Sequence, residues 1–370
     1  MKASLNIRAF SSALAIVTRA GPGGKATIPV LSCVMLSFSK ERQRVSMACT
    51  NLDVRIETSM AAPVEESGEL CVSSSIFTSI IRALPSENVT LTKIKNQIKI
   101  ESGSSKFSLH AIAASEFPPA PEISGEVKRI EFSQESLLSR IQSVSPAQSD
   151  DASRYILNGM FISQQKNAMN FVATDGRRLH LNSVKAESES TASLILPASS
   201  VAKLEPLLGS GKNVALTLAG RCVSFEIDRE EGDITMYSKV VDGAYPNYKQ
   251  VIPAGYADNT IKLKRDDLAQ AFRRVSLSLS DKNKSVKLAL KGTTLTLSAS
   301  SPEYGDANED VACENMKNVE SELAINPYFV IEALQATNDE HVTLKITDTI
   351  SPMVLIIGDL LSVIMPIRLS

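Results

Sequence analysis

The chain has 370 residues, of which 43% are hydrophobic and 22% are charged. This composition supplies enough apolar material for packed cores and excludes a wholly disordered protein. The formal net charge is −2, so the whole-chain charge gives no reason to expect affinity for nucleic acid, and any basic surface has to be local. A chain of this length is expected to form two or three domains of roughly 100 to 200 residues each.

The N-terminal segment MKASLNIRAFSSALAIV has neither the long apolar run nor the small-residue cleavage site of a secretory signal. No stretch approaches the ~20 consecutive apolar residues that cross a bilayer, so we expect a cytoplasmic protein that does not contact a membrane. The cysteines form no CxxC pair, and we expect no disulfide, no metal site and no cofactor. We interpret all five as reduced core residues: Cys33, Cys49, Cys71, Cys222 and Cys313.

The predicted elements recur in the same order in each third of the chain. The first is a helix with apolar residues at i, i+4 and i+7, and an alternating strand, a second helix and another alternating strand follow it. Ser, Ala-Ser or Asn-Pro before the second helix is expected to supply its N-cap or first residue. Neighbouring copies are offset by 124 to 131 residues, as marked by Phe10, Val34, Phe77 and Val89; by Leu137, Gly159, Val201 and Val214; and by Leu268, Val286, Val330 and Val342.

This order of elements predicts an α+β fold of three repeated domains, each with helices on one face of an antiparallel sheet. Polar segments that contain Pro and Gly, PPAPEISGEV and IPAGYADN, mark the expected boundaries near residues 125 and 255. We therefore predict domains at residues 1–125, 126–254 and 255–370.

Three such domains have a geometric consequence. A domain of about 125 residues has a diameter of about 35 Å, and six of them in a hexagon leave a hole of roughly 35 Å, wide enough for duplex DNA. A head-to-tail homodimer would supply six domains, and pairing the sheet edges at the two ends of each chain would close the ring. Four apolar residues are either contacts of that interface or ordinary core residues: Phe107, Leu109, Leu277 and Leu279.

Six segments carry a more specific pattern: GPGGKATIPVLS at 21–32, SSKFSLHAIAASEFP at 104–118, RYILNGM at 154–160, VATDGRRLHL at 172–181, YPNYKQVIP at 245–253 and the terminal VIMPIRLS. In order and spacing they resemble the DNA polymerase III beta subunit family, the bacterial sliding clamps, across essentially the whole chain. The resemblance implies the DNA clamp fold, with sheets outside and helices lining the pore of a dimeric ring. It also implies a processivity factor without catalytic residues, which tethers the replicative polymerase and other DNA-processing enzymes and is opened by a separate clamp-loader ATPase.

Cations on pore-facing helices and loops would attract the phosphates of duplex DNA without reading its sequence. The resemblance favours Lys25 and Tyr155 as contacts. In the second domain Ala198, Ser199 and Gln250 stand where many relatives have basic residues, which predicts weaker contact there. The candidate cations, each of which is otherwise an ordinary solvated charge, are Lys25, Arg82, Arg140, Lys203, Arg273, Arg274, Lys282 and Lys284.

The resemblance further implies a pocket that takes a short extended peptide with apolar anchors from polymerases and the clamp loader. One apolar subsite maps to Leu157, Thr174, Gly176, Arg177, Arg178, Leu179, Pro246, Val251, Val363 and Met365. The adjoining part maps to Arg154, Ile156, Asn326, Phe329, Ile350, Pro366, Ile367, Arg368 and Leu369. Ile156 and Phe329 replace tyrosines common in the family and Ser370 extends the usual C-terminus, so peptide preference is expected to differ.

Other interpretations compete with this one. Taken alone, Thr174-Asp175-Gly176 is typical of a plain turn, and MPIRL of an edge strand. The GPGGK segment lacks the Ser or Thr that a phosphate-binding loop places after its lysine, which argues against nucleotide binding. An enzyme with a site at Asp175, Arg177 and Arg178 is disfavoured because the repeats share no polar signature. A divergent clamp paralogue with altered partners is the nearer alternative.

Overall fold

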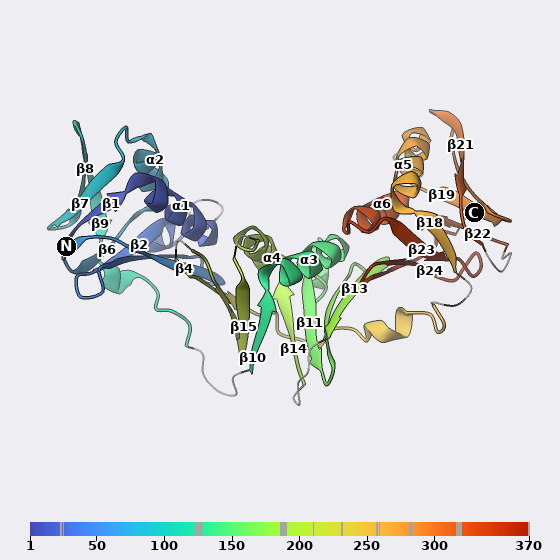
Figure 1. Ribbon diagram of the computed structural model, residues 1–370, viewed down its shortest axis with the longest axis horizontal. Helices are drawn as coiled ribbons and strands as arrows, with labels where there is room; N and C mark the ends of the chain where they lie inside the picture. The colour runs from blue at the N-terminus through green and yellow to red at the C-terminus, as the bar shows by residue number, and fades with distance from the viewer. Residues whose placement is uncertain are drawn as a thin grey trace. The chain divides into compact units, whose positions relative to one another are not determined.

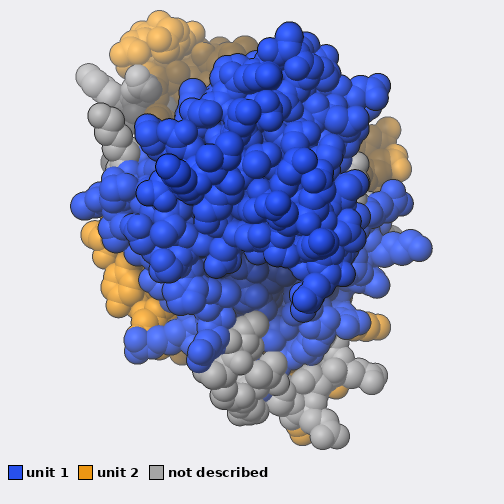
Figure 2. All heavy atoms as spheres, turned by 90° about the vertical axis from the view of Figure 1, so that its left-hand side faces the viewer, with its two compact units in different colours: residues 1–138, 202–240 blue, residues 139–201, 241–370 orange. Residues whose placement is uncertain are grey.

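The computed structural model describes residues 1–22, 24, 26–122, 128–185, 191–209, 211–230, 232–256, 258, 260–280, 284–315 and 320–368. The chain divides into two compact units (Figure 2). Unit 1 consists of Met1–Leu138 and Ala202–Val240, and unit 2 of Ser139–Val201 and Val241–Ser370. The central third of the chain contributes to both units. The exact domain bounds expected from the sequence therefore stay a prediction.

The described part of each third contains two α-helices (Figure 1), as the periodicity predicts. The apolar stripe residues of the first helix in each third are buried, with at most 2% exposure, because this face packs into the core. In unit 1 the rings of Phe10 and Phe77 meet edge to face with centroids 5.9 Å apart. The helices are α1 (Ile7–Val17), α2 (Ser74–Ala83), α3 (Gln134–Val144), α4 (Ala198–Leu204), α5 (Arg265–Val275) and α6 (Pro327–Gln335).

The starts of the second helices differ in their capping. Asn326 caps α6, because its side chain accepts a hydrogen bond from the Tyr328 backbone N at 3.1 Å, and Pro327 occupies the first helical position as predicted. At α2, Ser73 occupies the N-cap position without making a side-chain capping bond, and Ser74 is the first helical residue, one of the two positions expected for serine. The neighbouring Ser74 hydroxyl instead donates to the carbonyl oxygen of Ser32 at 2.9 Å.

The described strands of unit 1 form one antiparallel sheet in which the first and central thirds are joined by the pairing of β4 with β17. Val54 of β4 lies opposite Ser238 of β17. The order is β10 (Lys128–Ser133), β15 (Asn213–Ala219), β16 (Cys222–Ile227), β17 (Ile234–Lys239), β4 (Val54–Ala61), β3 (Arg44–Thr50), β2 (Cys33–Ser39), β6 (Gly68–Ser73), β9 (Ser105–Ile112), β8 (Gln97–Ser102), β7 (Asn88–Ile94), β1 (Lys2–Asn6) and β5 (Val64–Glu66).

The described strands of unit 2 form two antiparallel sheets, and the pairing of β13 with β25 joins the central third to the last third. The larger sheet has the order β14 (Ala192–Pro197), β11 (Gly159–Gln165), β12 (Ala168–Thr174), β13 (Arg178–Lys185), β25 (Leu360–Ile364), β24 (Met353–Ile357), β23 (His341–Lys345) and β18 (Ile261–Lys264). The smaller has the order β21 (Gly305–Ala312), β20 (Thr294–Ser301), β19 (Val286–Lys291) and β22 (Ser321–Ile325). The predicted α+β fold of three helix and antiparallel-sheet repeats is confirmed.

Among the described residues several strands pair on one side only, including β10, β14 and β22. Two further free edges, on β9 and β21, belong to the first and last thirds of the chain. Residues 105–110 of β9 pair with β8 alone, because β6 reaches only Ala111 and Ile112. Strand β21 pairs only with β20 along its whole length. Such edges present free backbone N–H and C=O groups and are available for pairing with another strand.

The cysteines are free thiols, and four of them are buried as expected: Cys33, Cys49, Cys71 and Cys313. The expectation of a core position is wrong for Cys222, which is partly exposed at the start of β16. None of the helices in the described part of the chain is both long and apolar enough to span a bilayer.

Candidate functional site

The turn between β12 and β13 is fixed by its own side chains. Thr174 Oγ1 accepts a hydrogen bond from the Gly176 backbone N at 3.1 Å and donates one to the Arg178 carbonyl oxygen at 2.6 Å. Asp175 Oδ1 accepts hydrogen bonds from the backbone N of Arg177 at 2.8 Å and of Arg178 at 3.0 Å. Gly176 has a φ of 85°, a left-handed conformation that suits glycine. These bonds give the Asp175 carboxylate a structural role, and they add no support to an active site there.

Arg178 connects this turn to two other segments. Its side chain is only 9% exposed, and its Nε donates to Asp175 Oδ2 at 3.2 Å. Its terminal nitrogens donate to the Glu332 carboxylate of α6 and to the carbonyl oxygen of Pro146. The guanidinium carbon lies 4.4 Å from the centroid of the Phe329 ring. A buried guanidinium is tolerated only with such partners, so Arg178 orients α6 and Phe329 with respect to the turn.

The C-terminal tail lies beside the same turn. Leu179 pairs with Val363 across β13 and β25, and the Met365 backbone N donates to the Arg177 carbonyl oxygen at 2.8 Å. Further along, the Ile367 backbone N donates to the carbonyl oxygen of Ala324 at 2.7 Å. Two predicted segments that are far apart in the sequence, 174–179 and 363–367, therefore lie next to each other.

A cavity of about 360 Å³, which we name the tail pocket, opens beside this tail. Its lining includes Val251 and Met365, both predicted contacts, together with Lys345, Thr347 and Pro352. Val251 is 46% exposed and Met365 is 41% exposed. The volume is in the range of pockets that hold small molecules or peptide side chains, and the two half-exposed apolar side chains would gain from being covered.

Leu179 and Val363 belong to a buried apolar cluster beneath the tail, which also contains Tyr248. Each of these two aliphatic side chains is only 2% exposed, so they offer little contact area themselves. They form the base of the region beneath the tail, which we name the apolar floor. At the edge of the cluster the rings of Phe161 and Tyr245 stack with centroids 4.7 Å apart. Burial raises the pKa of the Tyr245 hydroxyl.

The other predicted peptide contacts are distributed around this floor. Arg154 donates to Asp151 Oδ2 at 2.9 Å and to the Asp175 carbonyl oxygen at 2.9 Å, which ties it to the turn. Asn326 is used as the cap of α6. Leu369 lies outside the described residues. Those that are half-buried or exposed are Ile156, Leu157, Arg177, Pro246, Ile350, Pro366, Ile367 and Arg368.

Sequence reasoning missed Glu332, Tyr245 and Lys345 as parts of this region. Glu332 lies three residues after Phe329, so helical spacing placed it on the same face of α6. Its partner Arg178 is 154 residues away in the chain, and no local pattern could have indicated that pair.

The predicted DNA-contacting cations occupy different environments. Arg140 forms an ion pair with Asp359 at 3.4 Å, and Arg274 Nε forms one with Glu309 at 3.1 Å, so a phosphate would have to displace these carboxylates. Tyr155 is 58% exposed. Lys25 and Lys282 lie outside the described residues. Arg82, Arg273 and Lys284 are exposed, and Lys203 is half-buried.

The four candidate interface residues divide between surface and core. Leu277 is 79% exposed, in a 3-10 turn after α5, and Phe107 is 40% exposed in β9. Leu109 is half-buried. Leu279 is 9% exposed and packs in the core of unit 2.

The three histidines lie on separate strands: His110 on β9, His180 on β13 and His341 on β23. His180 is fully buried, and desolvation lowers its pKa from 6.5 to about 4. Its Nδ1 lies 2.9 Å from the carbonyl oxygen of Ser143. Among the residues that the structure describes, no group of three or more His, Cys, Asp or Glu side chains is arranged to hold a metal ion.

Models of one protein family match all three thirds of the chain. The model described as "DNA polymerase III beta subunit, N-terminal domain" matches residues 1–121. Those for the central and C-terminal domains of the same subunit match residues 131–247 and 249–368.

Curated relatives and solved structures extend over almost the whole chain. The beta sliding clamp of Synechococcus elongatus is 28% identical over 357 residues, which cover 94% of this chain and 92% of that protein. The Escherichia coli K12 beta sliding clamp is 29% identical over 358 residues, with 94% and 95% covered. A Pseudomonas aeruginosa sliding clamp bound to griselimycin has a TM-score of 0.93 at 27% identity, with 100% of both chains covered. A Bartonella birtlesii clamp bound to griselimycin has a TM-score of 0.89 at 26% identity, also with 100% of both chains covered.

The lowered pKa of His180 predicts how the free energy of unfolding depends on pH. The unfolded chain takes up a proton at His180 near pH 6.5 and the folded chain only near pH 4, so acidification between these values favours unfolding. We expect the free energy of unfolding to fall by roughly 3 kcal/mol more in the unchanged protein than in His180→Gln over this interval. Denaturant unfolding of both proteins at pH 7 and pH 4 measures the difference, and an equal fall in both would refute the assignment.

Proposed function

The chain belongs to the DNA polymerase III beta subunit family, and on that basis we propose that it acts as a DNA sliding clamp. The observation that carries the proposal is the match of all three domains of that subunit, in order, to one chain. A clamp holds DNA by encircling it, and this requires a closed ring but no catalytic group. We therefore assign it the role of a processivity factor that works in the cytoplasm and has no reaction of its own.

The ring is proposed to close by homodimerisation through two of the unpaired edges, β9 of one copy against β21 of the other. The opposite charges of the two strands support this pairing. Strand β9 carries Lys106, which lies 3.8 Å from Glu101, and β21 carries Asp306 and Asp310 besides Glu309, which is paired with Arg274. The exposed Phe107 and Leu277 supply apolar surface for the same contact, as expected of an interface core.

Duplex DNA is proposed to pass through the ring and to be held through its phosphates, without sequence preference. The exposed Arg82 and Arg273 and the hydroxyl-bearing Tyr155 are the described residues best suited to this contact. Lys25 and Lys282 are proposed to assist them. Arg140 and Arg274 would contribute only after their carboxylate partners are displaced.

The tail pocket and the apolar floor next to it are proposed to take short peptide motifs of the replicative polymerase and of a clamp loader. The half-exposed Val251 and Met365 offer the apolar contact, and the exposed Arg177 offers charge at the rim. The Phe329 ring lies against the Arg178 guanidinium and, unlike the tyrosine common in the family, carries no hydroxyl. We expect the site to favour apolar over polar groups of the peptide at this position.

Deletion of residues 366–370 tests the peptide assignment. We expect the affinity for a peptide from the replicative polymerase to fall by more than about tenfold, because the predicted contacts Pro366, Ile367, Arg368 and Leu369 are removed. Fluorescence anisotropy with a labelled peptide measures the affinity, and sedimentation of the truncated protein provides the control, since its mass should stay that of the full-length assembly. Unchanged affinity would reject the assignment.

A topological assay tests the clamp role itself. After loading by a clamp loader with ATP onto nicked circular DNA, the protein is expected to stay bound through gel filtration in high salt. Linearising the same DNA with a restriction enzyme should then release it, because a ring can slide off an end. Equal loss from circular and linear DNA would contradict encirclement.

A further inference from the structure

Two joints of the same geometry connect successive thirds of the chain. The first joint is the pairing of β4 with β17, and the second joint is the pairing of β13 with β25. Ile56 lies opposite Met236 in the first joint, and His180 lies opposite Ser362 in the second. All four residues have 0% exposure, and we call each of these two pairs the buried pair of its joint.

The same tight turn leads into both joints. Thr50 Oγ1 accepts a hydrogen bond from the Leu52 backbone N at 3.0 Å and donates one to the Val54 carbonyl oxygen at 2.9 Å. Thr174 makes the same two bonds with the residues two and four positions after it. Ile56 follows Thr50 by as many residues as His180 follows Thr174, so β4 and β13 correspond residue by residue.

Strand β21 is the counterpart of β4 in the last third of the chain. The residue that corresponds to Ile56 is found by stepping across the sheet through pairs of opposite residues, starting five positions before the aligned Phe77 or Val330. The pairs in the first third are Val72 with Val34, Leu36 with Met47 and Cys49 with Ile56, and those in the last third are Ile325 with Val286, Leu288 with Leu297 and Ala299 with Ala307. Ala307 therefore occupies the position of Ile56.

Strand β9 is likewise the counterpart of β17 and β25. Here the steps start on the strand after the second helix, two residues beyond the aligned Val89, Val214 or Val342. They run through Leu91, Ile100 and Phe107 in the first third, Leu216, Phe225 and Met236 in the central third, and Leu344, Leu355 and Ser362 in the last third. Phe107 therefore occupies the position that Met236 and Ser362 have in their joints.

These positions give the register of a joint between β9 of one copy and β21 of another. Phe107 would lie opposite Ala307 of the second copy, as in the buried pairs of the other two joints. Phe107 is 40% exposed and Ala307 is half-buried in the single chain, so the pairing would cover both. Antiparallel counting then puts the exposed His110 opposite Tyr304 of the second copy, whose side chain is 64% exposed.

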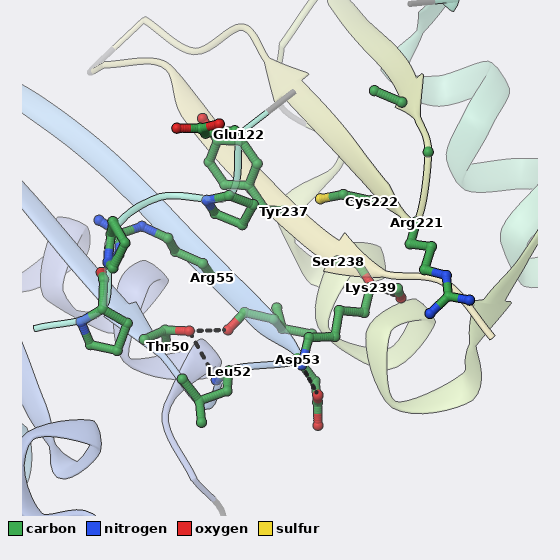
Figure 3. Close-up of a pocket in the computed structure, with 16 residues that line it drawn as sticks. Thr50, Leu52, Asp53, Arg55, Glu122, Arg221, Cys222, Tyr237, Ser238 and Lys239 are labelled. Carbon is green, nitrogen blue, oxygen red and sulfur yellow. Dashed lines mark hydrogen bonds and ion pairs between the residues drawn. The ribbon is translucent and has the colours of Figure 1, made fainter. Parts of the chain in front are cut away.

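The first joint carries an ion pair at the position that corresponds to His110. The backbone N of Lys239 donates to the Asp53 carbonyl oxygen at 2.9 Å, and Lys239 Nζ lies 3.1 Å from Asp53 Oδ1 (Figure 3). Lys239 stands three residues after the buried pair of its joint, as His110 stands three residues after Phe107. A cation at this position is therefore within reach of a carboxylate on the segment opposite.

Two carboxylates lie within two residues of Tyr304, those of Glu303 and Asp306. Both side chains are exposed, and in the described part of the chain neither forms an ion pair. Lys287 lines the same surface hollow as Asp306, but it is paired with Glu322 at 2.8 Å. Negative charge at this end of β21 is therefore available to a cation of another chain.

We propose that His110 of one copy pairs with Glu303 and Asp306 of the other copy, and that the charge of its imidazole regulates the strength of the dimer. The contact rests on the pairing of β9 with β21, which belongs to the proposed function. The joints inside the chain have Lys239 or Met365 at this position, and neither side chain changes its charge near neutral pH.

The surroundings of His110 within its own unit leave this contact to a second copy. His110 lies opposite the uncharged Gln97 of β8, and β6 reaches β9 only beyond it, through Cys71 and Val72. The charged residues of β8, of β9 and of the turn before β8 are Lys95, Lys99, Glu101 and Lys106. Glu101, the one carboxylate in that set, is already shared by Lys99 at 3.1 Å and Lys106 at 3.8 Å.

Protonation and dimerisation are coupled at such a contact. Imidazole gains its charge roughly between pH 8 and pH 5, whereas carboxylates keep theirs over this interval. A neighbouring carboxylate favours the charged imidazole, so the dimer binds more protons than two separate chains do. The dimer is therefore stronger at the acid end of the interval and weakens as the pH rises.

Sedimentation equilibrium of the full-length protein at about pH 5.5 and about pH 8 measures the dissociation constant of the dimer. A ring has two identical joints, so a gain of about threefold at each joint lowers this constant by about tenfold at the lower pH. His110→Gln should reduce the ratio to below about twofold, and so should Glu303→Gln combined with Asp306→Asn. His110→Lys copies the first joint, and its dimer should be equally strong at both pH values.

His341→Gln is the matched control, because His341 lies on β23 and on neither of the two edge strands. This variant should keep the ratio of about tenfold. His180 has a pKa of about 4 and stays neutral over the interval, so it does not contribute. The substituted side chains of His110, Glu303 and Asp306 are exposed, and the melting temperature of their variants should match that of the unchanged protein.

The two proposals fail in different ways. A dimer with no pH dependence, or one whose pH dependence survives in His110→Gln or in the double carboxylate variant, would overturn the contact and leave the pairing of β9 with β21 in place. A chain that stays monomeric at both pH values would reject that pairing, and the contact of His110 with it.

Discussion

Pairing of sheet edges is the constraint on which this fold depends. Each third of the chain forms antiparallel strands, and an uncovered edge strand would leave rows of backbone N–H and C=O groups free. The first third covers its β4 edge with β17, and the central third covers its β13 edge with β25. Strands β9 and β21 are among the described strands that keep a free side, and we propose a second copy of the chain as the partner that covers both.

The pairings of β4 with β17 and of β13 with β25 form the two joints between successive thirds of the chain, and the tail pocket lies beside the second of them. Each joint forms where a tight turn meets the end of a strand from the next third, so the same hydrogen bonds recur around Thr50 and Thr174. The side chains that fill the two joints differ, and the difference decides their chemistry. Arg178 anchors α6 at one joint, whereas Arg55 lies over the Phe117 ring, 5.1 Å from its centroid, at the other.

Much of the fold could be predicted because it depends on local patterns. Apolar residues at helical spacing placed the helices that contain Phe10, Leu137 and Leu268, and all three side chains are buried there. Contacts between distant segments could not be predicted in this way. The pair of Arg178 and Glu332 depends on how α6 meets β13, and no spacing along the chain encodes it. That the turn at residues 174–179 lies beside the tail at 363–367 was predicted from the resemblance to a known family, because the periodicity of the sequence does not indicate which distant segments meet.

We propose that the free edges of β9 and β21 pair between two copies of the chain. Hydrogen–deuterium exchange of the backbone amides in residues 105–110 and 305–312 measures this pairing directly. We expect slow exchange of both segments at concentrations where the protein has the mass of a dimer, and faster exchange of both on dilution to the monomer. Fast exchange of both segments in the dimer would contradict it.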